Sequence, residues 1–220
     1  MLRVETHCHT IYSKDSLTPL AKLLAACQQK NIDRVIITDH NSIQGALRAK
    51  ALDPERVIVG EEIMTTGGEI LAAYVTEEIP QGLAPQEAID RLRAQGAFIS
   101  VSHPFDSLRS GGWKLPDLLA ILPGVDAIET FNARCVLARF NEQASAFARQ
   151  HGLLGTAGSD AHIVSELGTA TLLLPGFEDA ASLKTAISQG KQQNRLSPHW
   201  VHGCSTYAKW AKKLKIARGS

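Results

Sequence analysis

Residues 4–16, VETHCHTIYSKDS, place His7 and His9 at the end of a hydrophobic run close to the beginning of the chain. Side chains of a β-strand alternate between its two faces, so two histidines at this spacing point to the same side. Such a pair does not by itself distinguish a metal site from two hydrogen-bonded histidines. The segment therefore predicts a strand and makes the ends of the following strands the place to look for further ligands.

Short runs rich in Val, Ile and Phe alternate with segments whose apolar residues recur every three or four positions, which predicts alternating strands and helices. Repeated β-then-α order is typical of a parallel sheet, and this number of units favours a closed barrel. The expected strands are residues 2–7, 34–40, 56–62, 69–75, 97–103, 126–132 and 153–162. The expected helices are residues 18–30, 42–52, 84–96, 115–124, 136–152 and 176–190.

Six of the seven expected strands end in a potential metal ligand, and only residues 69–75, a candidate hairpin return, do not. Ligands of barrels and parallel sheets collect where the carboxyl ends of the strands meet. If the last strand continues far enough, Asp160 and His162 also share a face. The strand-end residues are His7 and His9, Asp39 and His40, Glu61 and Glu62, His103, Asn132, and Asp160 and His162.

The chemistry of this set favours divalent metals. Burying so many imidazoles and carboxylates together without a cation would be costly. Nitrogen and oxygen donors without cysteine suit Zn²⁺, Mn²⁺ or Fe²⁺, and eight or nine ligands are too many for one tetrahedral ion. We therefore expect two or three ions that share a carboxylate. Such sites activate water and hold phosphate oxygens.

The composition is that of an ordinary folded protein, with 44% hydrophobic and 20% charged residues in 220. The four cysteines show no CxxC spacing, which argues against a disulfide framework or a zinc knuckle. The N-terminus lacks the pattern of a secretory signal, and no apolar run is long enough to span a membrane. We expect a cytoplasmic location and no membrane partner. The oligomeric state is not predicted.

Charge divides the chain unevenly. All 22 acidic residues lie at or before Asp179, whereas 8 of the 23 basic residues follow it, so the first part carries 15 − 22 = −7 and the second +8. We expect one domain over residues 1–195 and a basic extension over 196–220 that docks on the same domain. Residues 191–206 are expected to be irregular, and residues 207–220 to form a short basic helix.

Five ordered motifs, ETHCHT (5–10), ITDHNSIQG (37–45), GEEI (60–63), SHPFD (102–106) and GSDAH (158–162), resemble the PHP superfamily, the polymerase and histidinol phosphatase domains. The resemblance runs from about residue 2 to residue 175. It implies a distorted (β/α)7 barrel, an α/β fold of the TIM-like type, with a trinuclear metal site that hydrolyses phosphoesters.

The resemblance also implies a grouping of the ligands. His7, His9, Glu62 and Asp160 would hold one ion, with Glu62 bridging to a second ion held by His103. Asp15, His40 and His162 would hold a third. The chain departs from the family pattern at two ligand positions, where many relatives have histidine and this sequence has Asp15 and Asn132. The amide of Asn132 is the weaker donor, so we expect the second ion to be the most loosely held.

Two arginines follow the strand ends at the same mouth, Arg109 after His103 and Arg134 after Asn132. A planar guanidinium can bind two phosphate oxygens, so both are candidate phosphate ligands, although a loop arginine can also be merely solvated.

The leading hypothesis is a metal-dependent phosphoesterase that acts on a small phosphorylated metabolite or nucleotide, for example a nucleoside 3′,5′-bisphosphate, through a metal-bound hydroxide. One alternative is a 5′-3′ exonuclease on short RNA or DNA, which the basic tail favours and the lack of an aromatic stacking run disfavours. Another alternative is a catalytically silent metal-binding regulatory module.

Overall fold

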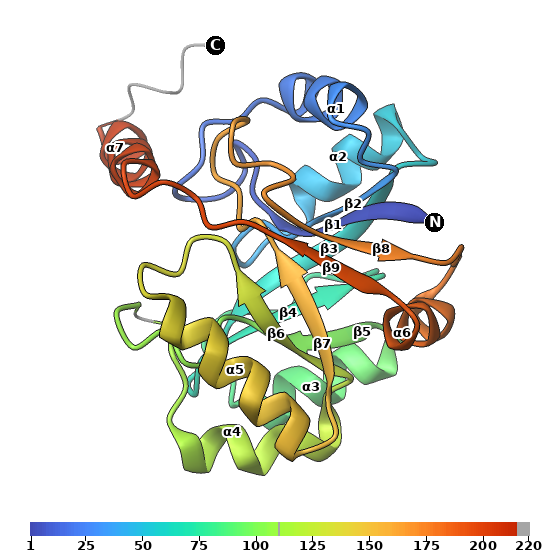
Figure 1. Ribbon diagram of the computed structural model, residues 1–220. Helices are drawn as coiled ribbons and strands as arrows, with labels where there is room; N and C mark the ends of the chain where they lie inside the picture. Colours follow the sequence, from blue (N-terminus) through green and yellow to red (C-terminus); the bar gives the residue numbers. More distant parts are fainter. Residues whose placement is uncertain (110, 215–220) are drawn as a thin grey trace.

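The computed structural model describes residues 1–109 and 111–214 (Figure 1). Its strands form one sheet in the order β7-β6-β5-β4-β3-β2-β1-β8-β9. The strands are β1 (Leu2–Cys8), β2 (Arg34–Ile37), β3 (Val57–Met64), β4 (Glu69–Ala73), β5 (Phe98–Val101), β6 (Ala127–Asn132), β7 (Leu154–Gly158), β8 (Ala170–Leu174) and β9 (Lys191–Asn194).

Helices follow most of these strands, and several of them pack against the sheet (Figure 1). They are α1 (Leu20–Gln29), α2 (Gln44–Leu52), α3 (Pro85–Ala94), α4 (Leu115–Ile121) with the 3₁₀ turn η1 (Leu122–Gly124), α5 (Ala138–Gln150), α6 (Ala180–Ser188) and α7 (Val201–Lys213). Among these described helices, none is long and apolar enough to cross a membrane.

The sheet is an almost closed barrel, which confirms the expected fold class. Strands β1, β2 and β3 are mutually parallel, as are β5, β6 and β7. Between these two sets, β4 runs antiparallel to both neighbours, as expected of a hairpin return. At the carboxyl end, the segment after β7 meets β1, because the amide of His9 donates to Ala161 O at 2.8 Å. At the other end of β1, β8 pairs with Leu2–Val4.

Two hydrophobic clusters stabilise this arrangement. Successive side chains of a strand point to opposite faces of the sheet and so belong to different clusters. On β2, Val35 and Ile37 belong to the larger cluster with Leu23 of α1 and Leu92 of α3. The intervening Ile36 belongs to the second cluster, which also contains the α6 side chains that pack on the sheet. Period-two alternation between two apolar environments explains why these strands are hydrophobic throughout.

The end of the sheet differs from the expectation. Residues 170–174 form β8, which the strand pattern did not identify, and residues 191–194, expected to be irregular, form β9. All four β9 side chains are exposed, so the strand carries no hydrophobic alternation, and its backbone pairing with β8 alone defines it. The expected helix 207–220 begins earlier, at Val201, and its positions 215–220 lie outside the described residues.

Candidate metal centre

Eight of the nine expected ligands converge at the carboxyl end of the barrel. Their side chains are almost wholly buried, and even the most exposed of them, His40, has an exposed side-chain fraction of 10%. Six of them, together with Glu69, make up three overlapping groups, in each of which the donor atoms lie within 4.8 Å of one another, and Asp160 and His103 lie beside these groups. The eight are His7, His9, Asp15, His40, Glu62, His103, Asp160 and His162.

The first group consists of His9, Asp15, His40 and His162. The loop after β1 brings Asp15 between the other side chains, so that Asp15 Oδ2 lies 3.3 Å from His40 Nε2 and Asp15 Oδ1 lies 3.2 Å from His162 Nε2. One carboxylate thus connects two imidazoles from different strand ends. The set resembles the third ligand set expected from the sequence.

The second group is formed by the histidine pair of β1 with Glu62 of β3. His9 Nε2 lies 3.2 Å from His7 Nε2, 3.3 Å from Glu62 Oε2 and 3.2 Å from Asp160 Oδ1. The expected common face of His7 and His9 is therefore present. Glu61, the neighbouring candidate, points elsewhere and accepts a hydrogen bond from the Ile79 amide.

The third group contains Glu69, which the sequence pattern missed. Its oxygens lie 3.5 Å from His40 Nδ1 and 3.2 Å from His103 Nε2, while Glu62 Oε1 is 3.3 Å from the same His103 nitrogen. Glu69 is the first residue of β4. Because β4 is antiparallel to its neighbours, its beginning lies at the mouth where the parallel strands end. The hairpin signal could have pointed to this residue.

Surrounding groups orient the histidines. Glu129 Oε1 lies 2.9 Å from His7 Nδ1, Ser13 Oγ lies 3.0 Å from His9 Nδ1, and the carbonyl of Asp160 lies 2.8 Å from His162 Nδ1. These contacts leave the Nε2 atoms of all three rings facing the centre. Contacts of this kind fix the tautomer and orientation of metal-binding histidines.

The last expected strand ends before the ligands it was thought to carry. β7 stops at Gly158, and Asp160 has a φ of 51°. The simple alternation expected for Asp160 and His162 does not apply, because this backbone conformation turns the chain between them. His103, just after β5, also has a positive φ of 22°. Such conformations are rare for residues other than glycine and cluster at functional sites.

Asn132 is an expected ligand whose amide is hydrogen-bonded to protein groups beside the three groups. Its Oδ1 accepts hydrogen bonds from the Arg134 amide at 2.9 Å and from Arg109 at 3.3 Å, and its Nδ2 donates to Glu129 at 3.0 Å and Asp160 at 3.2 Å. Both ends of the amide are thus engaged by protein groups. Asn132 connects carboxylates and arginines here, and Glu62 and Glu69 are carboxylates that face His103.

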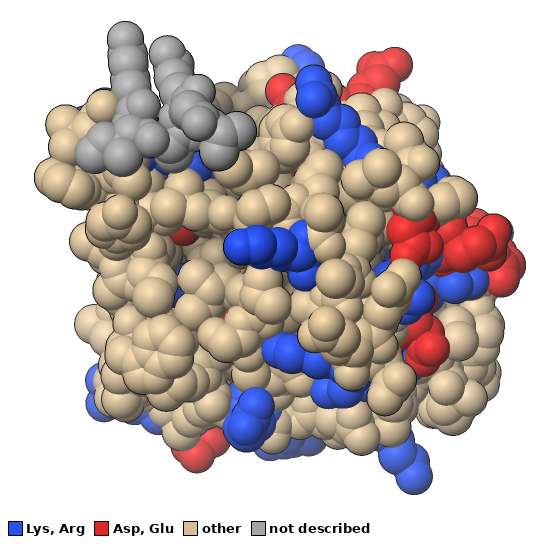
Figure 2. All heavy atoms as spheres, turned by 90° about the horizontal axis from the view of Figure 1, so that it is seen from above, with Lys and Arg blue, Asp and Glu red and all other residues tan. Residues whose placement is uncertain are grey.

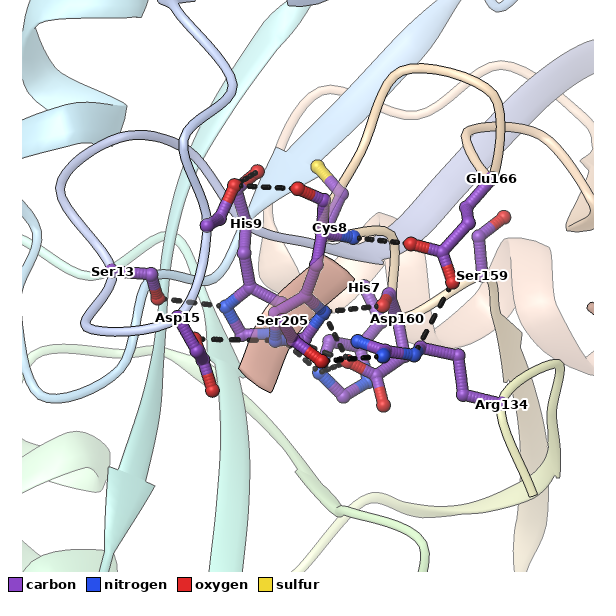
Figure 3. Close-up of polar contacts among 12 residues, drawn as sticks. His7, Cys8, His9, Ser13, Asp15, Arg134, Ser159, Asp160, Glu166 and Ser205 are labelled. Atoms are coloured by element: carbon purple, nitrogen blue, oxygen red, sulfur yellow. Dashed lines mark hydrogen bonds and ion pairs between the residues drawn. The ribbon is translucent and has the colours of Figure 1, made fainter. Parts of the chain in front are cut away.

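Both predicted arginines line one cavity of about 300 Å³ that also borders Asp15, His40, Asp160 and His162. Arg109 pairs with Asp160 and, at 3.1 Å, with Asp106. Arg134 is buried; its Nε lies 3.2 Å from Glu166 Oε1, and its guanidinium donates to Ser205 Oγ at 2.8 Å. Figure 3 shows Arg134 between Glu166 and Ser205, beside the histidine cluster.

Several buried histidines and carboxylates of the centre have pKa values far from their usual ranges. Burial lowers the pKa of His9 to about 3, aided by the charge of His162. Burial and Arg109 would lower the pKa of His103, but its contacts with Glu62 and Glu69 raise it to about 9. Burial would raise the pKa of Glu62, yet the nearby histidines hold it well below its usual range. Glu62 is therefore ionised and available as a ligand at neutral pH.

The side chains present fit divalent ions. Among the described residues, Asp15 Oδ1, His40 Nδ1 and Glu62 Oε2 are buried polar atoms without a hydrogen-bond partner. Each belongs to at least one of the three groups and lies close to another candidate ligand without forming a hydrogen bond to it, a cost that a bound cation would offset. Nitrogen and oxygen donors in this number suit Zn²⁺, Mn²⁺ or Fe²⁺.

Comparisons of the structure with solved proteins agree with the fold. PsfC from Pseudomonas syringae PB-5123 superposes with a TM-score of 0.68 at 21% identity, covering 96% of this chain and 99% of that chain. A candidate metal-dependent phosphoesterase from Bifidobacterium adolescentis ATCC 15703 gives a TM-score of 0.62 at 16% identity, covering 86% of this chain and 96% of that chain. At these identities the likeness concerns the fold.

Sequence comparisons identify the family. Residues 5–79 match the model of the PHP domain, and residues 138–191 match a model described as PHP-associated. The uncharacterized protein MJ0417 of Methanocaldococcus jannaschii is 38% identical over 172 residues, which cover 77% of this chain and 69% of that protein. On this evidence, and in agreement with the resemblance seen in its motifs, the chain belongs to the PHP family.

Proposed function

We propose that this protein is a metal-dependent phosphoesterase that hydrolyses a phosphate ester of a small metabolite or nucleotide, for example a nucleoside 3′,5′-bisphosphate. The observation that carries the proposal is the position of the three ligand groups: they share His9, His40 and Glu62, and members of two of them border a cavity lined by two arginines. A protein of the same fold is described as a candidate metal-dependent phosphoesterase, which supports this choice of chemistry.

The three groups would hold two or three divalent ions. His9, Asp15, His40 and His162 would bind one, His7, His9 and Glu62 with Asp160 a second, and Glu62, Glu69 and His103 with His40 a third. Bound divalent ions would supply positive charge and a nucleophile at neutral pH. Their affinity depends on the orienting contacts, above all that between His7 and Glu129.

The arginines would bind and orient the phosphate. Each guanidinium can donate two hydrogen bonds in a plane, which matches two oxygens of a phosphate. Arg109 and Arg134 reach the cavity from different loops, so they would bind a phosphate from two sides. A volume of about 300 Å³ lies at the lower end of the range for small-molecule pockets, so it suits a metabolite or mononucleotide.

A 5′-3′ exonuclease remains the second candidate because α7 exposes aromatic side chains, Tyr207 and Trp210, with exposed fractions of 56% each. Exposed aromatics can stack on bases of single-stranded nucleic acid. On the face seen in Figure 2, however, Lys and Arg side chains stand in separate groups between uncharged ones, and they form no continuous track for a phosphate backbone. We therefore place the small substrate first and a silent regulatory module last.

The test is a substrate screen with Mn²⁺ added, covering phosphorylated metabolites, mononucleotides, nucleoside bisphosphates and short oligonucleotides. Release of inorganic phosphate from a small ester, at a rate well above that from oligonucleotides, supports the proposal. Processive shortening of an oligonucleotide, with little hydrolysis of small esters, would favour the exonuclease. Tight metal binding without turnover of any member would favour the regulatory module.

A further inference from the structure

Helix α7 forms one wall of the cavity although it lies outside both segments that match the family models, which end at residue 191. His202, Ser205, Thr206 and Lys209 contribute to the cavity lining together with the residues of the metal centre. The helix therefore borders the candidate site with side chains that the family pattern does not specify.

The helix is fixed at this position from both ends. Its first turn is held by buried Arg134, which donates to the carbonyl of Val201 at 3.3 Å and to Ser205 Oγ at 2.8 Å. Its last turn is held by Lys212, whose ammonium group donates to the carbonyls of Ile11, at 2.6 Å, and of Ser13. The loop after β1 that carries these carbonyls also carries Asp15. The wall is thus attached to elements that build the metal centre.

The cavity is lined by four cationic side chains of two kinds. Arg109 and Arg134 face the carboxylates Asp160 and Glu166 on the inner side. Lys14 and Lys209 are exposed at the rim. Lys209 has an exposed side-chain fraction of 57%, and its ammonium group lies 3.5 Å from Asp15 Oδ2. Asp15 is itself a member of a candidate ligand group. A metal ion bound by Asp15 would compete with Lys209 for this carboxylate, and the ammonium group of Lys209 would then be available to another anion.

We propose that Lys209, with Lys14 of the same cavity lining, forms an outer anion subsite that selects phosphoesters whose alcohol part carries a second negative group, a carboxylate or a phosphate. The inference rests on the proposed function, because it assumes that the inner arginines and the metal centre bind the scissile phosphate. An ammonium group is a point charge without a fixed bonding plane, so it can accept either kind of anion.

The experiment compares matched pairs of esters on the purified metal-loaded protein: glycerol 3-phosphate with 3-phosphoglycerate, and 5′-AMP with adenosine 3′,5′-bisphosphate. Apparent Kd values come from thermal-shift titration, which does not require turnover. We expect the member with the second anionic group, in at least one pair, to bind about 5-fold more tightly, in keeping with one added exposed charge pair. The pair that shows the preference identifies the second group as carboxylate or phosphate.

The variants are Lys209→Ala, Lys209→Arg and, as the matched control on the same helix but outside the cavity lining, Lys213→Ala. Lys209→Ala should abolish the preference by weakening the binding of only the ester with the second anionic group. Lys209→Arg should retain most of the preference, and Lys213→Ala should leave it unchanged. Equal binding within both pairs by the unaltered protein, or equal weakening of both members in Lys209→Ala, overturns the subsite.

Turnover separates this inference from the proposed function. Selective binding without hydrolysis of any ester contradicts the proposed function and leaves the subsite in place. Hydrolysis of small esters without any preference for the second anion supports the proposed function and overturns the subsite.

Discussion

Glu129 Oε1 lies 2.9 Å from His7 Nδ1, and both side chains are fully buried. The carboxylate holds the ring so that His7 Nε2 faces Glu62 at 3.4 Å and Asp160 at 3.6 Å. The same carboxylate accepts the amide of His103 at 2.9 Å, so one side chain orients candidate ligands from two strands.

This relationship predicts that Glu129→Gln weakens metal binding while the candidate ligands remain in place. Losing an orienting carboxylate typically costs about 10- to 100-fold in metal affinity. Competition with a fluorescent chelator measures the change. Glu142→Gln, an exposed change on α5, is the control and should bind metal as the unaltered protein does. Unchanged affinity in Glu129→Gln would show that His7 needs no such support.

The different contacts of Glu69 and Asn132 predict that Glu69 contributes more than Asn132 to the number of bound metal ions. Glu69 faces His40 and His103 directly, whereas both polar atoms of Asn132 are hydrogen-bonded within the protein. Glu69→Gln should therefore lower the number of divalent ions retained after dialysis, and Asn132→Ala should lower it less. Inductively coupled plasma mass spectrometry gives both counts. The reverse order would restore Asn132 as a ligand.

Arg109 is expected to act on the phosphate rather than on the metals. Arg109→Lys keeps the positive charge but loses the planar pair of donors, so kcat/KM for a small phosphoester should fall by about 100-fold with metal content unchanged. Arg91→Lys, an exposed change on α3, is the matched control. A variant with normal kinetics would make Arg109 a structural partner of Asp160 and Asp106.

A stability prediction concerns Asp126, at the opposite end of the barrel from the metal centre. Burial would raise its pKa, but hydrogen bonds from Arg93 at 2.7 Å, Lys184 at 2.9 Å and the Ile99 amide at 2.9 Å hold that pKa below its usual value. The ionised carboxylate therefore stabilises the fold above the unfolded-state pKa near 4, and this contribution is lost as the pH falls through the lower folded-state pKa.

Asp126→Asn should accordingly lower the free energy of unfolding by about 1–2 kcal/mol at pH 7. The difference from the unaltered protein should stay constant above about pH 5 and shrink below about pH 4. Urea unfolding at several pH values measures it. A difference that persists undiminished at pH 3 would mean that the charge of Asp126 is not the cause.

The sequence predicted the fold class and the meeting of eight polar residues because strand-end positions in a parallel barrel converge whatever the details of the loops. It missed Glu69, because a strand of reversed direction brings its first residue to that end. It missed β9, whose pairing is made by backbone groups, and the earlier start of α7 at Val201. The conformation of Asp160 depends on the contact of the β7 end with β1, which no local pattern encodes.

The central claim, that buried histidines and carboxylates hold divalent ions that the protein needs for phosphoester hydrolysis, is tested most directly by elemental analysis combined with chelation. We predict at least two Zn, Mn or Fe ions per chain in the purified protein, loss of phosphatase activity in EDTA, and its return when Mn²⁺ is added. A protein that contains no divalent metal and hydrolyses phosphoesters equally well in EDTA would contradict the claim.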